Sequence, residues 1–542
     1  MTAPSRRRVA AFAAGLLALT LAACSGEEPE NNDLAGNRVG AMSDYAVGKQ
    51  FKATEPISFS MLYNNHPNYP IKKEWLFWSE LTNRTGVTLE STVVPLSDYE
   101  QKRSLMIGAG DAPLIIPKTY PGQETPFVAS GAILPVSDYV DLMPNFKDKV
   151  AKWKLEGDLN TIRQQDGKYY VLPGMHQDVW KDYSIAVRTD ILAEVGQPVP
   201  KTWDEVYTML KAMKAKYPNV YPFSDRWHKP TPGGALFNVL GEAFGTHGGW
   251  GYHNDQWDPA AKKFVFTGAT DQYRQMVTYL NKLVKEGLLD PESFTQDDDQ
   301  ARQKLATGKS FVISANAQTL VNDYRPDLSK NPKATITKIP VPVGPAGEIK
   351  TGLRLENGVM ISKKARDSKN FVAMMQFIDW LWYSDEGQEF AKWGVPGTTY
   401  NKDGSGKFTL AADVDYVKLN PSGTKHLQKD FGFGNGVFAY GGRTELLQST
   451  FSAEELEFQK VMATRQTLPV PPPHPFEDAE QEQATLYDTP LKDYVGQMTL
   501  KFILGQRDLS EWDAYVAELK GKNMDAYLEL VNKAYDRYAA KS

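Results

Sequence analysis

The chain has 542 residues, a formal net charge of −5 and 41% hydrophobic residues, which is enough to bury a large core and to form more than one domain. Its balance of 61 Lys and Arg against 66 Asp and Glu argues against a nucleic-acid partner, which would require a basic face. The only cysteine, Cys24, has no second cysteine to pair with, which excludes a fold held by disulfides.

The first 23 residues are typical of an export signal. Three arginines at positions 6–8 precede an uncharged run rich in Ala and Leu, which is shorter than the roughly 20 apolar residues that span a bilayer. The run ends in LAAC at Cys24, which resembles the bacterial lipobox, whose cysteine is lipidated and becomes the mature N-terminus. We therefore predict a signal peptide at 1–23 and a lipid anchor on Cys24. The paired arginines also resemble a twin-arginine signal, so two export routes stay open.

Residues 24–50 are predicted to be a flexible tether between the lipid and the folded body. This stretch is polar and has few large apolar side chains, so it cannot bury enough surface to fold by itself. The anchor and tether together predict a protein at the extracellular face of the cell membrane.

The body begins with alternating strand and helix patterns. Residues 56–63 alternate apolar and polar side chains as a strand does, and a helix is expected at 72–82, a strand at 87–94 and a helix at 98–107. This order predicts an α/β fold with parallel strands. Further on, residues 371–382 are apolar almost all round, which indicates a helix buried on several sides.

Six segments, in the same order along the chain, resemble a known family. They are DGKYYVLP at 166–173, VRTDIL at 187–192 with PKTWDE at 200–205, LVKEGLL at 283–289, FIDW at 377–380 with SDEGQ at 384–388, WGVPGTTY at 393–400, and the tail around FILG at 502–505 with EWDAY at 511–515. These segments are similar to those of carbohydrate-type solute-binding lipoproteins of the long LplA/LipO type. The resemblance covers nearly the whole mature chain.

The resemblance implies a type II periplasmic-binding fold, in which two α/β lobes with mostly parallel sheets close on a ligand by hinge motion. The chain would cross between lobes near 174–184, near 352–358 and after Tyr400. The expected division is an N-terminal lobe at 51–176 and 353–405, and a C-terminal lobe at 177–352 and mainly at 406–542. The expected partners are a carbohydrate, in the first place an oligosaccharide, together with an ABC import permease and the membrane. The protein is expected to act as a monomer.

No cofactor or metal is expected. Some relatives carry an acidic calcium loop after the helix that begins at the KTWDE motif, but residues 217–223 here read YPNVYPF and supply no set of carboxylates. His247 and His253 are six residues apart in a glycine-rich loop and are interpreted as solvated.

Two other functions stay open at this point. The chain has no HExxH, GxSxG or catalytic-cysteine pattern. Paired carboxylates need only be close in space, however, so a surface polysaccharide lyase or hydrolase is one alternative. A peptide-binding receptor of the same fold is another.

Sugars are bound by flat aromatic faces beside amides, carboxylates and guanidinium groups. We therefore looked for Trp and Tyr beside such groups in loops at strand ends. The predicted ligand-binding residues are Asn64, Asn65, Tyr120, Trp180, Tyr183, Arg226, Trp227, Trp250, Asn316, Arg354, Glu356, Trp393 and Tyr440. Arg226, Arg354 and Arg443 would suit a uronate carboxylate, although neutral sugars also use arginine.

Overall fold

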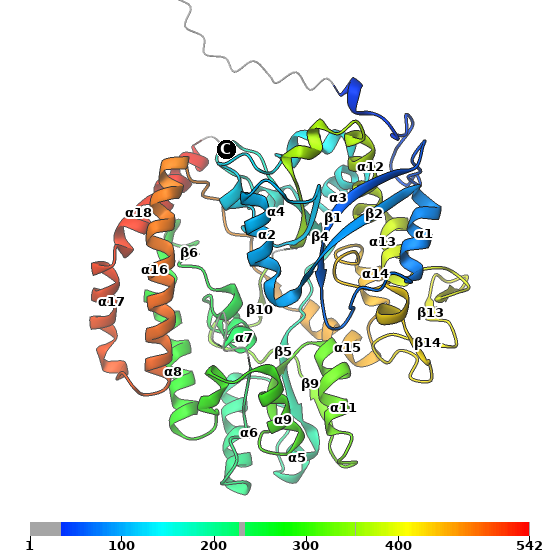
Figure 1. Cartoon of the computed structure of the whole chain (residues 1–542). Coiled ribbons are helices and arrows are strands. Elements are labelled where there is room, and N and C mark those ends of the chain that lie inside the picture. The colour runs from blue at the N-terminus through cyan, green and yellow to red at the C-terminus, as the bar shows by residue number, and fades with distance from the viewer. Residues whose placement is uncertain (1–33, 227–232, 353, 541–542) are drawn as a thin grey trace, which may run out of the picture.

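The chain folds into two α/β lobes, which lie one above the other in Figure 1. The computed structural model describes residues 34–226, 233–352 and 354–540. The predicted signal peptide and Cys24 therefore lie outside the described residues. Within the described ranges, the helices are all too short or too polar to cross a membrane.

The N-terminal lobe is built on a five-stranded sheet with the order β2-β1-β3-β11-β4. Its strands are β1 (Ile57–Asn65), β2 (Val87–Pro95), β3 (Ile115–Thr119), β4 (Leu172–Met175) and β11 (Leu355–Ile361). β1 pairs in parallel with β2 and β3, as the alternating pattern predicts, whereas β11 runs antiparallel to β3 and β4. The second connection between the lobes thus returns as a central strand of this sheet.

Helices flank this sheet. They are α1 (Leu76–Thr85), α2 (Tyr99–Gly108), α3 (Pro144–Trp153), α4 (Glu156–Asn160), α12 (Phe371–Tyr383) and α13 (Asp385–Trp393). Every residue of α12 is buried, which confirms the prediction from its apolar sequence. A helix that is apolar all round stabilises the fold by packing on several sides at once, and α12 lies at the centre of the N-terminal core.

The C-terminal lobe contains a three-stranded sheet with the order β8-β5-β9, formed by β5 (Ser184–Arg188), β8 (Val312–Ala315) and β9 (Ile336–Lys338). β5 runs antiparallel to both neighbours. The N-terminal sheet is therefore mixed and the C-terminal sheet is antiparallel, so neither is mostly parallel as expected. A short hairpin, β6 (Asp255–Asp258) with β7 (Lys263–Phe266), packs against the C-terminal helix α18 (Met524–Ala539).

Helices surround the C-terminal sheet and extend it along one side. They are α5 (Thr189–Glu194), α6 (Trp203–Lys216), α7 (Gly234–Phe244), α8 (Asp271–Lys285), α9 (Asp298–Ala306), α10 (Ala317–Thr319), α11 (Arg325–Leu328), α15 (Ala453–Ala463), α16 (Asp478–Ile503), α17 (Trp512–Gly521) and α18 (Met524–Ala539). A capping box of Thr202 and Glu205 starts α6, and the side chain of Thr270 caps α8. In Figure 1, α16–α18 form the orange and red side of the molecule.

The folded body begins earlier than residue 51. Asn37 Nδ2 donates to Ser368 O (2.8 Å), Met42 N donates to Gln376 Oε1 (2.9 Å), and Tyr45 donates to Asp379 Oδ2 (2.9 Å). The second half of the predicted tether is thus packed against α12 and its N-terminal end. Polar composition suggested a free segment, but its few apolar groups and backbone amides find partners that only the folded lobe provides.

The third crossing between lobes also lies later than predicted. Residues 401–442 contain β12 (Tyr400–Lys402), β13 (Phe408–Leu410), β14 (Val414–Asp415) and β15 (Lys425–His426). Phe433, Phe438 and Tyr440 belong to the N-terminal core, whereas Phe458 belongs to the C-terminal core. The chain therefore crosses near residues 441–452, through α14 (Thr444–Gln448), and the part of 406–542 before this point belongs to the N-terminal lobe. These segments are short and irregular, so they have no periodic hydrophobic pattern from which the sequence could assign them to a lobe.

Candidate functional site

The candidate site lies where side chains of the two lobes approach one another. Tyr120 follows β3 of the N-terminal lobe and 47% of its surface is exposed. Its pKa is raised to about 12, first by loss of water around it and then by carboxylates that include Glu356 and Asp182. Asp182 directly precedes β5 of the C-terminal lobe. Because its charge acts on Tyr120, the two lobes face each other across this space.

Trp250 and Tyr183 form the aromatic part of the site on the C-terminal lobe. Their rings meet edge to face, with centroids 4.8 Å apart at 80°. Trp250 lies in a single helical turn, Gly249–Gly251, and is 40% exposed. A Cβ atom on Gly249 would lie 2.0 Å from Gly234 O, so only glycine lets this turn approach α7 closely enough to hold the ring at the surface.

A chain of polar contacts joins the first two connections between the lobes. His176 Nε2 lies 2.8 Å from Glu356 Oε2, and Trp180 Nε1 donates to the same His176 nitrogen at 3.3 Å. Gly441 N donates to Glu356 Oε1 (2.8 Å), which brings in the third connection. Glu356 is thereby held in one orientation by all three segments that join the lobes.

A groove of about 630 Å³ lies beside this chain of contacts. We call it the hinge groove, because its walls come from the three connections between the lobes. It is lined by Asp158, Gln177, Asp178, Val179, Trp180, Lys350, Gly352, Arg354, Thr444, Leu447, Gln448, Phe451, Gln459, Ala463, Thr467, Leu468, Pro469 and Val470. Its volume is in the range of small-molecule sites. Trp180 both lines the groove and contacts His176, so the wall of the groove is linked to the Glu356 contacts.

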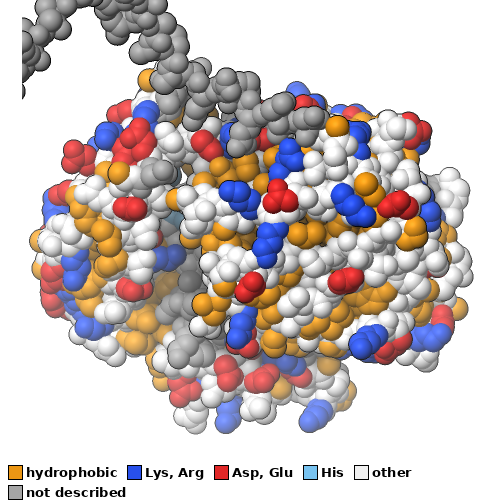
Figure 2. Space-filling view, turned by 45° about the horizontal axis from the view of Figure 1, so that its top comes forward, with side chains coloured by type: hydrophobic (Ala, Val, Ile, Leu, Met, Phe, Trp, Pro, Cys, Tyr) orange, Lys and Arg blue, Asp and Glu red, His pale blue; other side chains and the backbone are white. Residues whose placement is uncertain are grey.

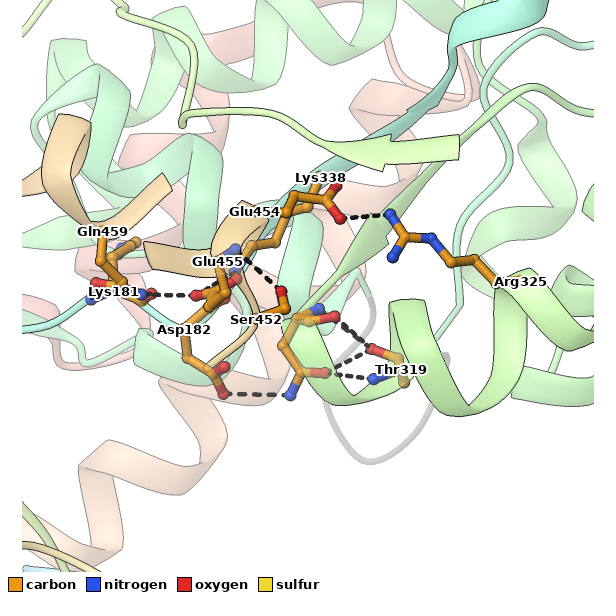
Figure 3. Close-up of polar contacts among 10 residues, drawn as sticks. Lys181, Asp182, Thr319, Arg325, Lys338, Ser452, Glu454, Glu455 and Gln459 are labelled. Carbon is orange, nitrogen blue, oxygen red and sulfur yellow. Dashed lines mark hydrogen bonds and ion pairs between the residues drawn. The ribbon is translucent and has the colours of Figure 1, made fainter. Parts of the chain in front are cut away.

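Buried contacts fix the position of Asp182. Asn316 Nδ2 donates to Asp182 Oδ2 (3.2 Å), and Lys338 Nζ donates to the backbone oxygen of Asp182 (3.0 Å). Lys338 also binds Glu455 of α15, whose Oε1 accepts a hydrogen bond from Gln459 Nε2 (2.8 Å). Figure 3 shows these side chains converging from the first connection, β9 and α15.

Electrostatics distinguish the two carboxylates at the site. Burial disfavours ionisation of Glu356, but the His176 ring and the Lys118 ammonium outweigh it and hold the pKa below its ordinary value. Burial raises the pKa of Asp182, and Lys338 and Asn316 oppose this effect only in part. Glu356 is therefore a charged acceptor at neutral pH, and its lone pairs suit donors such as hydroxyl groups.

The structure brings together five of the residues predicted from sequence, namely Tyr120, Trp180, Tyr183, Trp250 and Glu356. Asn64 is the next-to-last residue of β1, and its Oδ1 atom is buried with no hydrogen-bond partner within the described residues. Asn65 accepts a hydrogen bond from Ile71 N (2.9 Å) and shapes the loop after β1. Asn316 donates a hydrogen bond to the Asp182 carboxylate. Trp227 lies outside the described residues.

Three predicted residues serve the fold instead, and a fourth, Arg354, lines the hinge groove with its guanidinium engaged inside the protein. Trp393 is 1% exposed, packs against Tyr400 and Phe408, and donates to Ser449 Oγ. Tyr440 is buried in the N-terminal core, close to Gly174. Arg226 is buried beside Asp298 (3.5 Å), and Arg354 is bound to Asp158. The sequence predicted these positions because each lies in a loop beside other aromatic or polar residues. In the structure, however, their side chains are engaged inside the protein.

Sequence reasoning missed His176 and Lys118. His176 follows the DGKYYVLP segment by three residues and lies on the first connection, which is the signal that could have found it. Lys118 stands over the Tyr120 ring, with its Nζ atom 5.7 Å from the centroid. It adopts a positive φ of 55°, which is uncommon for a residue with a side chain, and no sequence pattern announces such a conformation.

The face of the molecule that Figure 2 presents has no single dominant charge. Figure 2 shows acidic and basic side chains interspersed over the face presented there. A search of residues 34–226, 233–352 and 354–540 finds no group of three or more His, Cys, Asp or Glu side chains that could hold a metal ion.

The family model for bacterial extracellular solute-binding proteins matches residues 68–389, which is more than half of the chain. The chain belongs to this family. Its members bind solutes and do not catalyse a reaction on them, so the alternative of a surface lyase or hydrolase is not supported. The match begins in the loop after β1 and ends in α13, and so spans the first two connections between the lobes.

Two curated proteins are similar in sequence. The fructooligosaccharide ABC transporter substrate-binding protein FusA of Streptococcus pneumoniae is 24% identical over 538 residues, covering 92% of this chain and 94% of that protein. Lipoprotein LipO of Bacillus subtilis is 25% identical over 344 residues, covering 60% of this chain and 64% of that protein.

Solved structures share the fold. Alginate-binding protein AlgQ2, solved without calcium ion, superposes with a TM-score of 0.68 at 20% identity, covering 90% of this chain and 99% of that one. FusA in complex with kestose superposes with a TM-score of 0.65 at 21% identity, covering 90% and 100%. These likenesses confirm the two-lobed solute-binding fold that the sequence predicted.

Proposed function

We propose that this protein captures an oligosaccharide between its lobes and delivers it to an ABC import permease. The observation that carries the proposal is the pairing of exposed aromatic faces with fixed polar groups at one place. Tyr120 and Trp250 offer flat faces from opposite lobes, and Glu356 and Asp182 offer acceptors held by other side chains. Aromatic faces suit the C–H side of a sugar ring and carboxylates suit its hydroxyls.

The hinge groove supports a ligand longer than one sugar ring. Its volume is about 630 Å³, and Trp180 and Phe451 lie in its wall with ring centroids 6.0 Å apart. The names of relatives agree, since FusA is named for fructooligosaccharides. Because the groove walls come from three connections that bend together, ligand in this place would stabilise one relative orientation of the lobes.

We also propose that lipid on Cys24 anchors the protein at the extracellular face of the cell membrane. The LAAC sequence at Cys24 supports this, and so does the similarity to LipO, which is named a lipoprotein. Residues 25–33 would then link the lipid to the segment from residue 34 onward, which is packed on the N-terminal lobe. Anchoring keeps the receptor near its permease, which raises the effective concentration for delivery.

The proposal is tested by adding oligosaccharides and, separately, tri- to pentapeptides to the purified protein and measuring the melting temperature. Binding is then measured by calorimetry. We expect at least one oligosaccharide to raise the melting temperature, with no change in the sugar by chromatography. Stabilisation by peptides alone would support the peptide-receptor alternative, and release of shorter sugars would overturn a purely binding role.

A further inference from the structure

We infer that the ligand is an uncharged oligosaccharide, and that oligosaccharides containing uronates are rejected; this inference rests on the function proposed above. The fold cannot decide the matter, because FusA is solved with kestose, a neutral sugar, whereas AlgQ2 binds alginate, a polymer of uronates. The charges of this chain's own side chains can decide it.

Arg354 is the arginine in the wall of the hinge groove, but its guanidinium is fully engaged. Its Nη1 atom donates to Trp153 O (2.8 Å) and Gln177 O (3.2 Å). Its Nη2 atom donates to Lys154 O (3.0 Å) and Asp158 Oδ2 (2.8 Å). The four N–H bonds of the two terminal nitrogens are therefore all used. No pair of N–H groups on this face remains to bind a ligand carboxylate in the bidentate manner.

The other two candidate arginines are also neutralised within the chain. Arg226 is buried, with Nη1 3.5 Å from Asp298 and its guanidinium 5.5 Å from the centre of the Tyr324 ring. Arg443 lies with Nε 3.3 Å from Asp385 and Nη1 3.6 Å from Glu445. Arg226 is only 2% exposed, so moving its guanidinium to a ligand would break the ion pair of a buried cation, whereas the acidic partners of Arg443 are both largely exposed and hold it weakly.

The lysines near the site offer little positive charge in excess. Lys181 is paired with Glu242 (2.7 Å), and Lys338 with Glu455 (2.7 Å). Burial lowers the pKa of the Lys118 amine. The negative charge of Glu356 opposes this effect, because it favours the protonated amine. Lys350, in the hinge groove, donates to Ala463 O (3.3 Å), and burial lowers its pKa too. Each of these cations thus has an acidic or carbonyl partner inside the protein.

Carboxylates also lie at the ligand space, although Glu356 and Asp182 are hydrogen-bonded within the protein. Glu356 and Asp182 lie at the site itself, and Asp178 lines the hinge groove, where it accepts a hydrogen bond from Thr444 Oγ1 (2.6 Å). A carboxylate accepts strong hydrogen bonds from neutral hydroxyls. It repels another carboxylate, and partial exclusion of water strengthens that repulsion. The site therefore favours hydroxyl groups and disfavours uronates.

The test uses two ligands with one skeleton, trigalacturonate and its fully methyl-esterified form, together with the neutral probes kestose, maltotriose and xylotriose. Calorimetry with the wild-type protein at low and at high salt measures each affinity. We expect at least one neutral probe to bind at least tenfold more tightly than trigalacturonate. Any affinity for trigalacturonate should be below that for its methyl ester and should increase with salt, as screening of a repulsion requires.

Three outcomes have different meanings. Tighter binding of trigalacturonate than of every neutral probe, weakening with salt, would overturn this inference and leave the proposed oligosaccharide function intact. Binding of peptides with no sugar bound would overturn both. Preference for a neutral probe supports both.

A pair of variants assigns the preference to the site. Glu356→Gln removes one charge and keeps the shape of the side chain, so trigalacturonate should bind at least threefold more tightly than it does to the wild type. Glu74→Gln removes the same charge from an exposed position and should change neither affinity. Asp178→Asn in the hinge groove repeats the test if Glu356→Gln lowers the melting temperature. Equal effects of the site variants and the control would overturn the assignment.

Discussion

Lys338 of β9 forms an ion pair with Glu455 of α15 at 2.7 Å, and their side chains are only 1% and 5% exposed. The pair joins α15, which directly follows the third connection between the lobes, to the C-terminal sheet (Figure 3). Lys338 also donates to the backbone oxygen of Asp182. One buried lysine thus fixes both a helix of the hinge region and the start of the strand that carries Asp182 and Tyr183 to the site.

Breaking this pair should destabilise the fold. Glu455→Ala or Lys338→Met alone should lower the free energy of unfolding by about 3–5 kcal/mol, because each leaves an uncompensated buried charge. The double variant Lys338→Met with Glu455→Leu should lose less than the sum of the two single losses. Urea unfolding measures all three. Lys147→Met, which breaks the exposed pair with Asp141, serves as the control and should change stability by less than about 1 kcal/mol. Additive losses in the double variant would contradict the coupling.

Trp250→Ala and Tyr120→Ala should each weaken oligosaccharide binding about tenfold, which is about 1.4 kcal/mol. Both side chains are substantially exposed, so the melting temperature should stay close to that of the wild type. Trp393→Ala is the matched control. This ring is buried against Tyr400 and Phe408, so its loss should lower stability by about 3–5 kcal/mol. Calorimetry and thermal unfolding together separate the two effects, and a stability loss at Trp250 without a change in affinity would remove it from the site.

Glu124 should make stability depend on pH. Its carboxyl is fully buried, and burial raises its pKa to about 7, with hydrogen bonds from the backbone of Gly122 and the charge of Arg103 opposing the shift. The folded state thus holds the proton more tightly than the unfolded state, whose pKa is 4.5. The stabilising contribution is complete below pH 4.5 and is lost as the pH rises through 7.

The measurement compares Glu124→Gln with the wild type in urea at pH 5 and at pH 8. The glutamine cannot ionise, so the variant should gain about 2–3 kcal/mol relative to the wild type between these two pH values. Glu74→Gln, at an exposed position, should show no such gain. A difference between Glu124→Gln and the wild type that is constant with pH would show that the buried carboxyl does not titrate in this range.

Cys24→Ala should separate capture from delivery. The residue precedes the folded body, which begins by residue 34. The variant should therefore bind oligosaccharide in solution with wild-type affinity, yet cells that carry it should release the protein to the medium and import the sugar slowly. Membrane fractionation and an uptake assay measure these two effects. Retention of the variant in the membrane fraction would show that another feature anchors the protein.

Some features of the fold follow from local sequence. The alternating pattern at 56–63 predicts β1, and the capping box at Thr202 and Glu205 predicts the start of α6. The apolar run at 371–382 predicts a buried helix, which is α12. Each rests on interactions between residues within a few positions of one another, so the chain specifies them before any tertiary contact forms.

Only part of the candidate site could be predicted from local sequence. Two of the predicted residues, Tyr120 and Trp250, are aromatic residues in loops. Three others lie on the first two connections between the lobes, namely Trp180, Tyr183 and Glu356. Residue type and position in the chain were sufficient to select all five. Trp393 shares the same signals but is buried, and the guanidinium of Arg354, in the wall of the hinge groove, is bound to Asp158. The direction of a side chain depends on which partner is near it in space, and Asp158 is 196 positions away from the arginine that it binds.

The sequence by itself determined the two-lobed solute-binding family, the aromatic residues available near the hinge and the absence of any disulfide. Only the tertiary structure decided that residues 34–50 pack on α12, that residues 401–442 belong to the N-terminal lobe, and that each candidate arginine has an acidic partner. Periodicity and motifs arise from contacts between neighbours in the chain. Ion pairing and burial arise from contacts between distant segments, which exist only once both lobes have formed.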